Sequence, residues 1–381
     1  MRTPEKFDSI RPFEPEELPE VYDRLLADPG FRQVLAYLYP GVPVEAIGYK
    51  MRQCATSLDF QKAFCYGFLE QLLAKASTGC EMDTTAIDVT RRYTFVSNHR
   101  DIVLDSALLD KLLIDAGFST TCEIAIGDNL LSLPWVKDLV RVNKSFIVER
   151  GLPPRQMLLA SRLLSEYMHF AVEGKNENVW IAQREGRAKD SDDRTQPAIL
   201  KMMAMGGEGS MAERLLQLHI VPLSISYEYD PCDYLKAKEL QQRRDTEHFR
   251  KAPGDDVLSM RTGIMGYKGG IHYHCAPCID GYLSTLADVP KAELPDLVAA
   301  HIDREIHRHY RLYPSNLIAL DLQEGARSHA SGYTEEEKAM FEAYIDRQLA
   351  KIDLEHPDLP FLREQMLTMY ANPARNHFAS L

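Results

Sequence analysis

The chain has 381 residues, of which 45% are hydrophobic and 26% are charged, and its formal net charge at pH 7 is −12. This profile is typical of a soluble globular protein, and the acidic balance argues against nucleic acid as a main partner, because DNA- and RNA-binding proteins present a basic face. The seven cysteines are unevenly spaced and do not suggest a disulfide framework, which favours a reducing, intracellular setting.

Residues 1–85 are expected to form a helical N-terminal domain. Residues 1–20 are charged and proline-rich, without the apolar core of a signal peptide. Helices are predicted at 15–28, which ends at Pro29-Gly30, and at 31–38, 43–53 and 56–76. In the last of these, apolar residues recur mostly at three- and four-residue spacing, which is usual for a helix packed against a core.

Residues 86–381 are expected to form an α/β domain with C-terminal helices. Short apolar runs that read as strands alternate with helical patterns, which predicts a mixed, largely parallel sheet flanked by helices. The predicted strands are 93–97, 123–126, 145–148, 179–183 and 220–227. The predicted helices are 106–115, 154–172, 196–204 continuing into 213–218, 233–249, 291–311, 334–350 and 360–369, with mixed structure at 254–282.

The stretch YTFVSNHRDIVLDSALL, residues 93–109, carries the densest set of reactive groups. It reads as a buried strand, a polar turn with His99, and the start of a helix. A histidine with a carboxylate in reach, here Asp101 or Asp105, can act as a general base. The alternative is a helix start that Asn98 or Asp101 caps, with His99 merely exposed.

Two histidine-containing segments are candidates for metal binding, and neither predicts a site. HYHCAPCID, residues 272–280, contains one CxxC pair with two histidines before it. A closed zinc site usually needs a second, separate ligand pair, and no other CxxC exists in the chain. His301, His307 and His309 lie on one predicted helix but lack the histidine–carboxylate spacing of metallohydrolases. No bound metal is therefore expected.

Five short motifs follow one another between residues 90 and 230. They are SNHRDIVLD at 97–105, IAIGDNL at 124–130, NKSFIVER at 143–150, VWIAQREGRAKD at 179–190 and HIVPLSISYE at 219–228. In this order and at these spacings they resemble the motifs of the glycerolipid acyltransferases, the superfamily of glycerol-3-phosphate and lysophosphatidate acyltransferases. The resemblance implies the α/β fold of that superfamily.

The resemblance implies that His99 is the general base and that an aspartate orients it. The family's aspartate follows its histidine after four residues, but Leu104 stands at that position here. Asp105, one residue further on, is the expected partner, and Asp101 is the alternative.

The resemblance also implies a cradle for the phosphate of the acceptor. Its residues are Arg150, Glu185, Gly186 and Arg187, with Lys189 nearby. The spacing departs from the family, because Arg187 follows Gly186 directly and Ala188 takes the place where the arginine is expected. This departure bears on the identity of the acceptor more than on the reaction.

The implied reaction moves a fatty acyl group from a coenzyme A or acyl carrier protein thioester to a hydroxyl of glycerol 3-phosphate or lysophosphatidate in phospholipid synthesis. Direct transfer is favoured, because GGEGSMAE at 206–213 lacks the second glycine of a serine nucleophile elbow. No cofactor is expected beyond the acyl donor. Other anionic lysolipids or amino-acid lipids are alternative acceptors. A thioesterase or hydrolase with the same histidine, and a non-catalytic lipid-binding scaffold, are alternative functions.

The expected location is the cytoplasm, with peripheral association at the inner face of the membrane. No run of about 18 consecutive apolar residues is present, so no spanning helix is predicted. Contact with lipid would then be made from the membrane surface.

Overall fold

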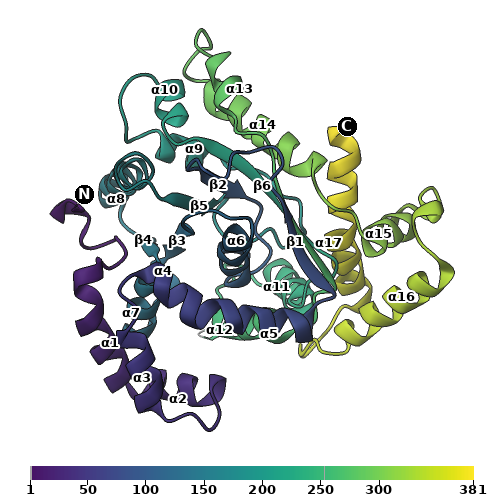
Figure 1. Ribbon diagram of the computed structural model, residues 1–381. Helices are drawn as coiled ribbons and strands as arrows, with labels where there is room; N and C mark the ends of the chain where they lie inside the picture. The colour runs from purple at the N-terminus through teal and green to yellow at the C-terminus, as the bar shows by residue number, and fades with distance from the viewer. Residues whose placement is uncertain (1, 253) are drawn as a thin grey trace.

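The computed structural model describes residues 2–252 and 254–381, and a seven-stranded sheet lies at its centre (Figure 1). The strand order is β1-β7-β6-β2-β5-β3-β4. The strands are β1 (Gly79–Asp83), β2 (Thr94–Ser97), β3 (Cys122–Gly127), β4 (Ser145–Val148), β5 (Asn178–Ala182), β6 (Ile220–Tyr227) and β7 (Gly270–Cys275).

The sheet is mixed and largely parallel, which confirms the predicted fold class. Strands β6, β2, β5, β3 and β4 are parallel neighbours, whereas β7 runs antiparallel to β6 and parallel to β1. Every residue of β2 and β6 is buried, as expected for strands covered on both faces. All five predicted strands are present, and β1 is an additional strand that lies after the last predicted helix of the segment 1–85, which was expected to be a helical domain.

Helices of the N-terminal segment precede most of the sheet; α1, α2 and α3 lie at the lower left of Figure 1, and α4 and α5 run across the middle of the view. They are α1 (Leu18–Ala27), α2 (Pro29–Leu38), α3 (Val44–Arg52), α4 (Ser57–Phe60) and α5 (Tyr66–Ala76). The prediction that Pro29-Gly30 only ends a helix is wrong, because this pair also begins α2. Asp28 accepts hydrogen bonds from the amides of Gly30 and Phe31, and proline is well suited to the first helical position.

The remaining helices cover both faces of the sheet and its β1 side. They are α6 (Leu104–Asp115), α7 (Pro134–Val142), α8 (Pro154–His169), α9 (Pro197–Met203), α10 (Met211–Leu216), α11 (Asp233–Asp245), α12 (Asp255–Met265), α13 (Asp280–Ser284), α14 (Leu294–Arg308), α15 (Pro314–Glu324), α16 (Glu335–Leu349) and α17 (Leu359–Ser380). Of these, α7, α12, α13 and α15 were not predicted, and α17 continues through Pro373.

Four apolar clusters hold these elements together. Helices α5 and α6 pack on one face of the sheet, and α8, α9 and α14 pack on the other. Helices α15, α16 and α17 form a third cluster with α11, and α1–α4 form a fourth with α7. The division of the chain into domains near residue 85 stays a prediction. Among the described residues, no helix combines the length and the apolar character needed to span a bilayer.

Candidate active site

The predicted site residues follow the carboxyl ends of neighbouring parallel strands. His99 follows β2, Arg150 follows β4, and residues 185–189 follow β5. Because β2, β5, β3 and β4 are parallel, these three segments leave the sheet at the same edge. This edge is where open α/β sheets bind their ligands.

His99 forms a close pair with Asp105 in the first turn of α6. The Nδ1 atom of His99 lies 2.8 Å from Oδ2 of Asp105, and the His99 side chain is 14% exposed whereas Asp105 is fully buried. The same Oδ2 accepts hydrogen bonds from the backbone amides of Arg100 and Asp101. The carboxylate therefore holds both the imidazole and the turn that carries it.

Asp101 has a different task, because its carboxylate caps α6. Its Oδ1 accepts hydrogen bonds from the amides of Val103 and Leu104, as an N-terminal capping residue does. Burial, followed by the nearby Asp105 carboxylate, raises the pKa of Asp101. The stretch thus contains both features considered for it, a capped helix and a paired histidine, on two separate aspartates.

Two further side chains fix the position of the His99 turn. Asn98 donates to the carbonyl of Ile225 in β6 and accepts from its amide, so it continues the sheet by one residue. The Trp180 ring from β5 meets the His99 ring edge-on, with centroids 5.8 Å apart, and its Nε1 donates to Ser97 Oγ. Sequence reasoning missed Trp180, although its place in a strand beside β2 was the available signal.

Arg187 is a buried guanidinium without a counterion at contact distance. It is 8% exposed, and within the described part of the chain its Nη1 has no hydrogen-bond partner and no carboxylate forms an ion pair with it. Gly186 precedes it with a φ of 69°, a left-handed conformation that glycine adopts without strain. An unpaired buried charge is costly unless a ligand completes its contacts.

Lys189 is already paired. Its Nζ lies 2.7 Å from Oε2 of Glu239 in α11, and burial together with the nearby Arg187 lowers the pKa of Lys189 to about 8. The structure places Lys189 beside the predicted cradle, with its charge balanced by a side chain of the protein itself.

Arg150 and Glu185 lie together at the more exposed side of the edge. Their Nη1 and Oε1 atoms are 3.6 Å apart, and the Glu185 side chain is 69% exposed. The Arg150 side chain also lies against Gly127, where an added Cβ would be 2.7 Å from Nε. The structure gives Arg150 and Arg187 no common contact, so the predicted cradle consists of two separate parts.

Sequence reasoning also missed Arg100, which anchors the loop after the cradle. Its Nη2 lies 2.8 Å from Oδ2 of Asp193, and both side chains are buried. The hydroxyl of Tyr310 donates to the same oxygen over 2.6 Å. Two residues of α17 hold this loop as well, because Asn372 donates to the Asp190 carbonyl and Asn376 to the Asp192 carboxylate.

An apolar cavity of about 310 Å³ lies between the N-terminal helices and α6. Its walls come from helices α2 to α7, from α12 and from the turn before α6. The lining includes Val34, Leu35 and Leu38 of α2, Phe68 and Leu69 of α5, Val103, Leu104 and Ala107 at the start of α6, Leu139 of α7 and Ile264 of α12. The cavity therefore reaches the same turn of α6 that carries Asp105.

The histidines and cysteines of the two segments that were considered for metal binding have separate surroundings in the structure. Cys275 is buried in an apolar cluster of the sheet, while His274 stacks on His309 with ring centroids 4.1 Å apart. His301 stacks instead on Tyr282, and His307 is buried against the carbonyl of Asp193. Neither the CxxC pair nor the three helix histidines converge on one point.

Comparison with known proteins finds a family match over the part of the chain that carries the motifs. Residues 82–226 match the acyltransferase family model. No curated protein sequence matches the chain. Among solved structures, the chain is similar to the 1-acyl-sn-glycerophosphate (LPA) acyltransferase PlsC from Thermotoga maritima at 13% identity and a TM-score of 0.37, over 77% of this chain and 97% of that chain. The part of the chain that carries His99, Arg150 and Arg187 is therefore the part that matches an acyltransferase domain.

Proposed function

We propose that the protein transfers a fatty acyl group from a thioester to a hydroxyl of a phosphate-bearing glycerol acceptor, with His99 as the general base. The observation that carries this proposal is the His99–Asp105 pair at the carboxyl edge of the parallel strands. Glycerol 3-phosphate and lysophosphatidate are the proposed acceptors, in keeping with the family of the domain.

In the proposed reaction, Asp105 accepts a hydrogen bond from the Nδ1–H group of His99, which leaves the lone pair on Nε2 free. Nε2 removes the proton of the acceptor hydroxyl as the oxygen attacks the thioester carbonyl. The tetrahedral intermediate then collapses, the carbon–sulfur bond breaks, and the imidazolium returns the proton to the departing thiolate. Asp105 stabilises the imidazolium during this cycle without taking the proton itself.

Arg187 is the proposed anchor for the acceptor phosphate. Its open Nη1 donor supports this role, because a guanidinium can give two parallel hydrogen bonds to phosphate oxygens. Arg150, with Glu185 beside it, would bind at the outer side of the same edge. Gly186 would provide the turn between Glu185 and Arg187. Lys189, which is paired with Glu239, would support the position of Arg187.

The apolar cavity is the proposed site for the acyl chain of the donor. Its lining includes Val103, at the end of the turn between His99 and α6, and Leu104, the first residue of α6. An acyl chain there would place its thioester end toward the His99 turn and its methyl end among the N-terminal helices. The donor would be an acyl-coenzyme A or an acyl carrier protein thioester, and no other cofactor is required by this reaction.

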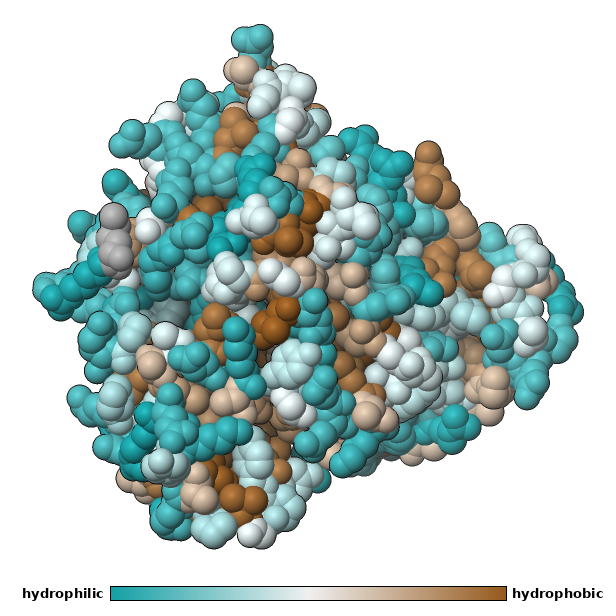
Figure 2. Space-filling view, viewed as in Figure 1, coloured by the Kyte–Doolittle hydropathy of each residue, from teal (hydrophilic) through white to brown (hydrophobic). Residues whose placement is uncertain are grey.

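Peripheral association with the inner face of the membrane is proposed from the surface around this cavity. Four large apolar side chains are exposed on α2, α3 and the loop between them, namely Tyr37, Leu38, Val42 and Tyr49. Leu38 also lines the cavity. Figure 2 shows apolar side chains over the tip of this helix pair, at the lower edge of the view. Exposed apolar groups of this kind favour contact with a lipid surface.

The proposal is tested by incubating the purified protein with labelled acyl-coenzyme A or acyl carrier protein thioesters and with glycerol 3-phosphate or lysophosphatidate. The expected result is an acylated product from one acceptor, absent in a folded His99→Ala variant. Near-normal turnover by His99→Ala would refute the assignment of the base. Free fatty acid released without any acceptor would favour a thioesterase, and product formed only with another anionic lysolipid would correct the acceptor.

A further inference from the structure

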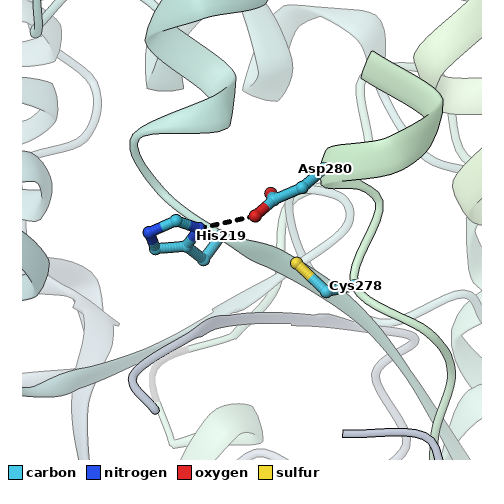
Figure 3. Close-up of side chains that lie close together, drawn as sticks. All are labelled: His219, Cys278 and Asp280. Atoms are coloured by element: carbon cyan, nitrogen blue, oxygen red, sulfur yellow. Dashed lines mark hydrogen bonds and ion pairs between the residues drawn. The ribbon is translucent and has the colours of Figure 1, made fainter. Parts of the chain in front are cut away.

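Three side chains with metal-ligand chemistry meet at the opposite end of β6 from the proposed active site (Figure 3). His219 precedes β6, whereas Cys278 and Asp280 follow β7. Because β7 runs antiparallel to β6, the start of one strand and the end of the other lie together. Ile220 of β6 pairs with Thr94 at the start of β2, so His99, beyond the end of β2, is at the other edge.

We propose that His219, Cys278 and Asp280 form a binding site for a zinc ion. One ligand atom from each residue lies within 4.8 Å of the other two, and imidazole, thiolate and carboxylate are the three ligand types that zinc takes in proteins. His219 is a ligand from outside the CxxC segment, at a position 59 residues before Cys278. The proposal does not depend on the proposed acyl transfer.

The local geometry of His219, Cys278 and Asp280 supports a metal-binding site. Nδ1 of His219 lies 2.7 Å from Oδ2 of Asp280, and Figure 3 shows the Cys278 sulfur beside this pair. The other oxygen of Asp280 is buried and has no hydrogen-bond partner among the described residues. His219 also has a φ of 46°, a conformation that is uncommon for residues other than glycine and recurs at functional sites.

Arg91 competes for the same ligands. Its Nη2 lies 3.3 Å from Nδ1 of His219 and 3.7 Å from an oxygen of Asp280. The Arg91 side chain is about half exposed, so it can turn into solvent when a cation arrives. The guanidinium thus balances the carboxylate in the absence of zinc, and zinc binding would require that it leave.

Zinc at this site would cross-link the start of β6 to the segment after β7. The thiol of Cys278 would release its proton to water as the zinc–sulfur bond forms, and a water molecule would complete four-coordination. Since the ion would bind the folded chain only, it would stabilise the fold in proportion to the logarithm of the free zinc concentration. The site is structural in this role and leaves the acyltransferase edge untouched.

The test uses the full-length protein after removal of metals with a chelator, titrated with zinc chloride by calorimetry and with Co²⁺ by absorption spectroscopy. The expected result is one zinc per chain, a rise in the thermal midpoint, and a thiolate-to-cobalt charge-transfer band. Cys278→Ser should lose the band and weaken zinc binding by more than about 10-fold, since even groups outside the ligand shell contribute about 10–100-fold. Cys80→Ser is the matched control and should bind as the wild type does.

Arg91→Ala separates a specific site from non-specific binding. Removal of the competing guanidinium should tighten zinc binding at this site, while binding elsewhere should not respond. The proposal is overturned if micromolar zinc does not bind, or if Cys278→Ser and the wild type bind zinc equally. It is also overturned if Arg91→Ala weakens binding in a protein that remains folded.

Discussion

Gly263 of α12 packs against the carboxylate of Asp101 so closely that a Cβ at position 263 would lie 1.8 Å from Oδ2. Asp101 caps α6, and its amide donates to Asp105. Helix α12, the second helix after β6, therefore supports the turn that carries His99, although it contributes no proposed catalytic group.

A methyl group at this contact should disturb both stability and activity. Gly263→Ala forces the Asp101 carboxylate or α12 to move, at a cost of about 1–3 kcal/mol for an overpacked site, and should lower acyl transfer. Urea unfolding and turnover measure the two effects. The control is Gly67→Ala in α5, where nothing lies within 4 Å of the added Cβ and stability should rise by up to about 1 kcal/mol. Equal stability and equal turnover of the two variants would contradict the role of the contact between Gly263 and Asp101.

Substitution of Asp105 and substitution of Asp101 should have different effects on the rate of acyl transfer. Asp105→Asn keeps the shape of the side chain but removes the charge that faces Nδ1, so kcat should fall by about 10²–10⁴-fold. Asp101→Asn should keep most of the activity, because asparagine caps helices as well as aspartate does. The turnover of both variants, compared with their circular dichroism spectra, tests the assignment. A larger loss in Asp101→Asn would reverse it.

Arg187 should matter for the acceptor more than for the fold. Arg187→Ala removes a buried charge that has no ion-pair partner, so the free energy of unfolding should stay equal or increase. The KM for a phosphate-bearing acceptor should rise by about 10- to 100-fold, as expected for the loss of a charge-assisted hydrogen bond of about 1.5–3 kcal/mol. Lys189→Ala is the comparison, because it leaves Glu239 without its closest partner and should lower stability. An unchanged acceptor KM in Arg187→Ala would exclude this anchor.

The cavity assignment predicts a dependence on acyl chain length. Ala107→Phe places a ring in the space that the cavity leaves beside α6, so transfer from long-chain donors should fall more than transfer from short-chain donors. Ala74→Phe, at an exposed position of α5, is the control and should leave the chain-length profile unchanged. The profile is obtained from initial rates with a series of thioesters. A uniform loss across the series would indicate that the cavity does not hold the acyl chain.

Asp110 should make stability depend on pH. Burial raises the pKa of Asp110 from 3.8 to about 7, so between these values the folded state holds a proton that the unfolded state has released. Stability should therefore decrease as pH rises through this window. Asp110→Asn removes the titration and should flatten this part of the profile, which urea midpoints from about pH 5 to pH 7.5 would show. If the urea midpoints of the wild type and of Asp110→Asn changed with pH in the same way, the raised pKa of Asp110 would be contradicted.

Much of the sheet and the position of His99 could be predicted because both depend on local patterns. The sequences of β2 and β6 are rich in apolar residues. A polar turn follows β2 directly, so the end of the strand and the reactive groups appear in one stretch. The choice between Asp105 and Asp101 could not be made from spacing, because it depends on where α6 begins. With Leu104 as the first helical residue, Asp105 falls in the first turn, where its carboxylate meets His99.

Other features arise from contacts between distant segments and leave no local signal. The partner of Lys189 lies on α11, fifty residues later in the chain, so its pairing could not be read from the motif. The antiparallel direction of β7 brings Cys278 close to His219. The CxxC pattern had suggested instead that Cys275 and Cys278 would be ligands of the same metal ion. The burial of Arg187 likewise depends on the elements packed around its loop.

The loop at 190–195 has a consequence for how the domain can be isolated. It lies inside the range that matches the acyltransferase family, yet Tyr310, Asn372 and Asn376 bind it from α17 and from the segment after α14. A fragment cut at residue 226 would lose these anchors and leave the Arg100–Asp193 pair without its cover. The family match is therefore smaller than the set of residues that holds this loop in place, so an expressed or redesigned version of the protein should keep α17.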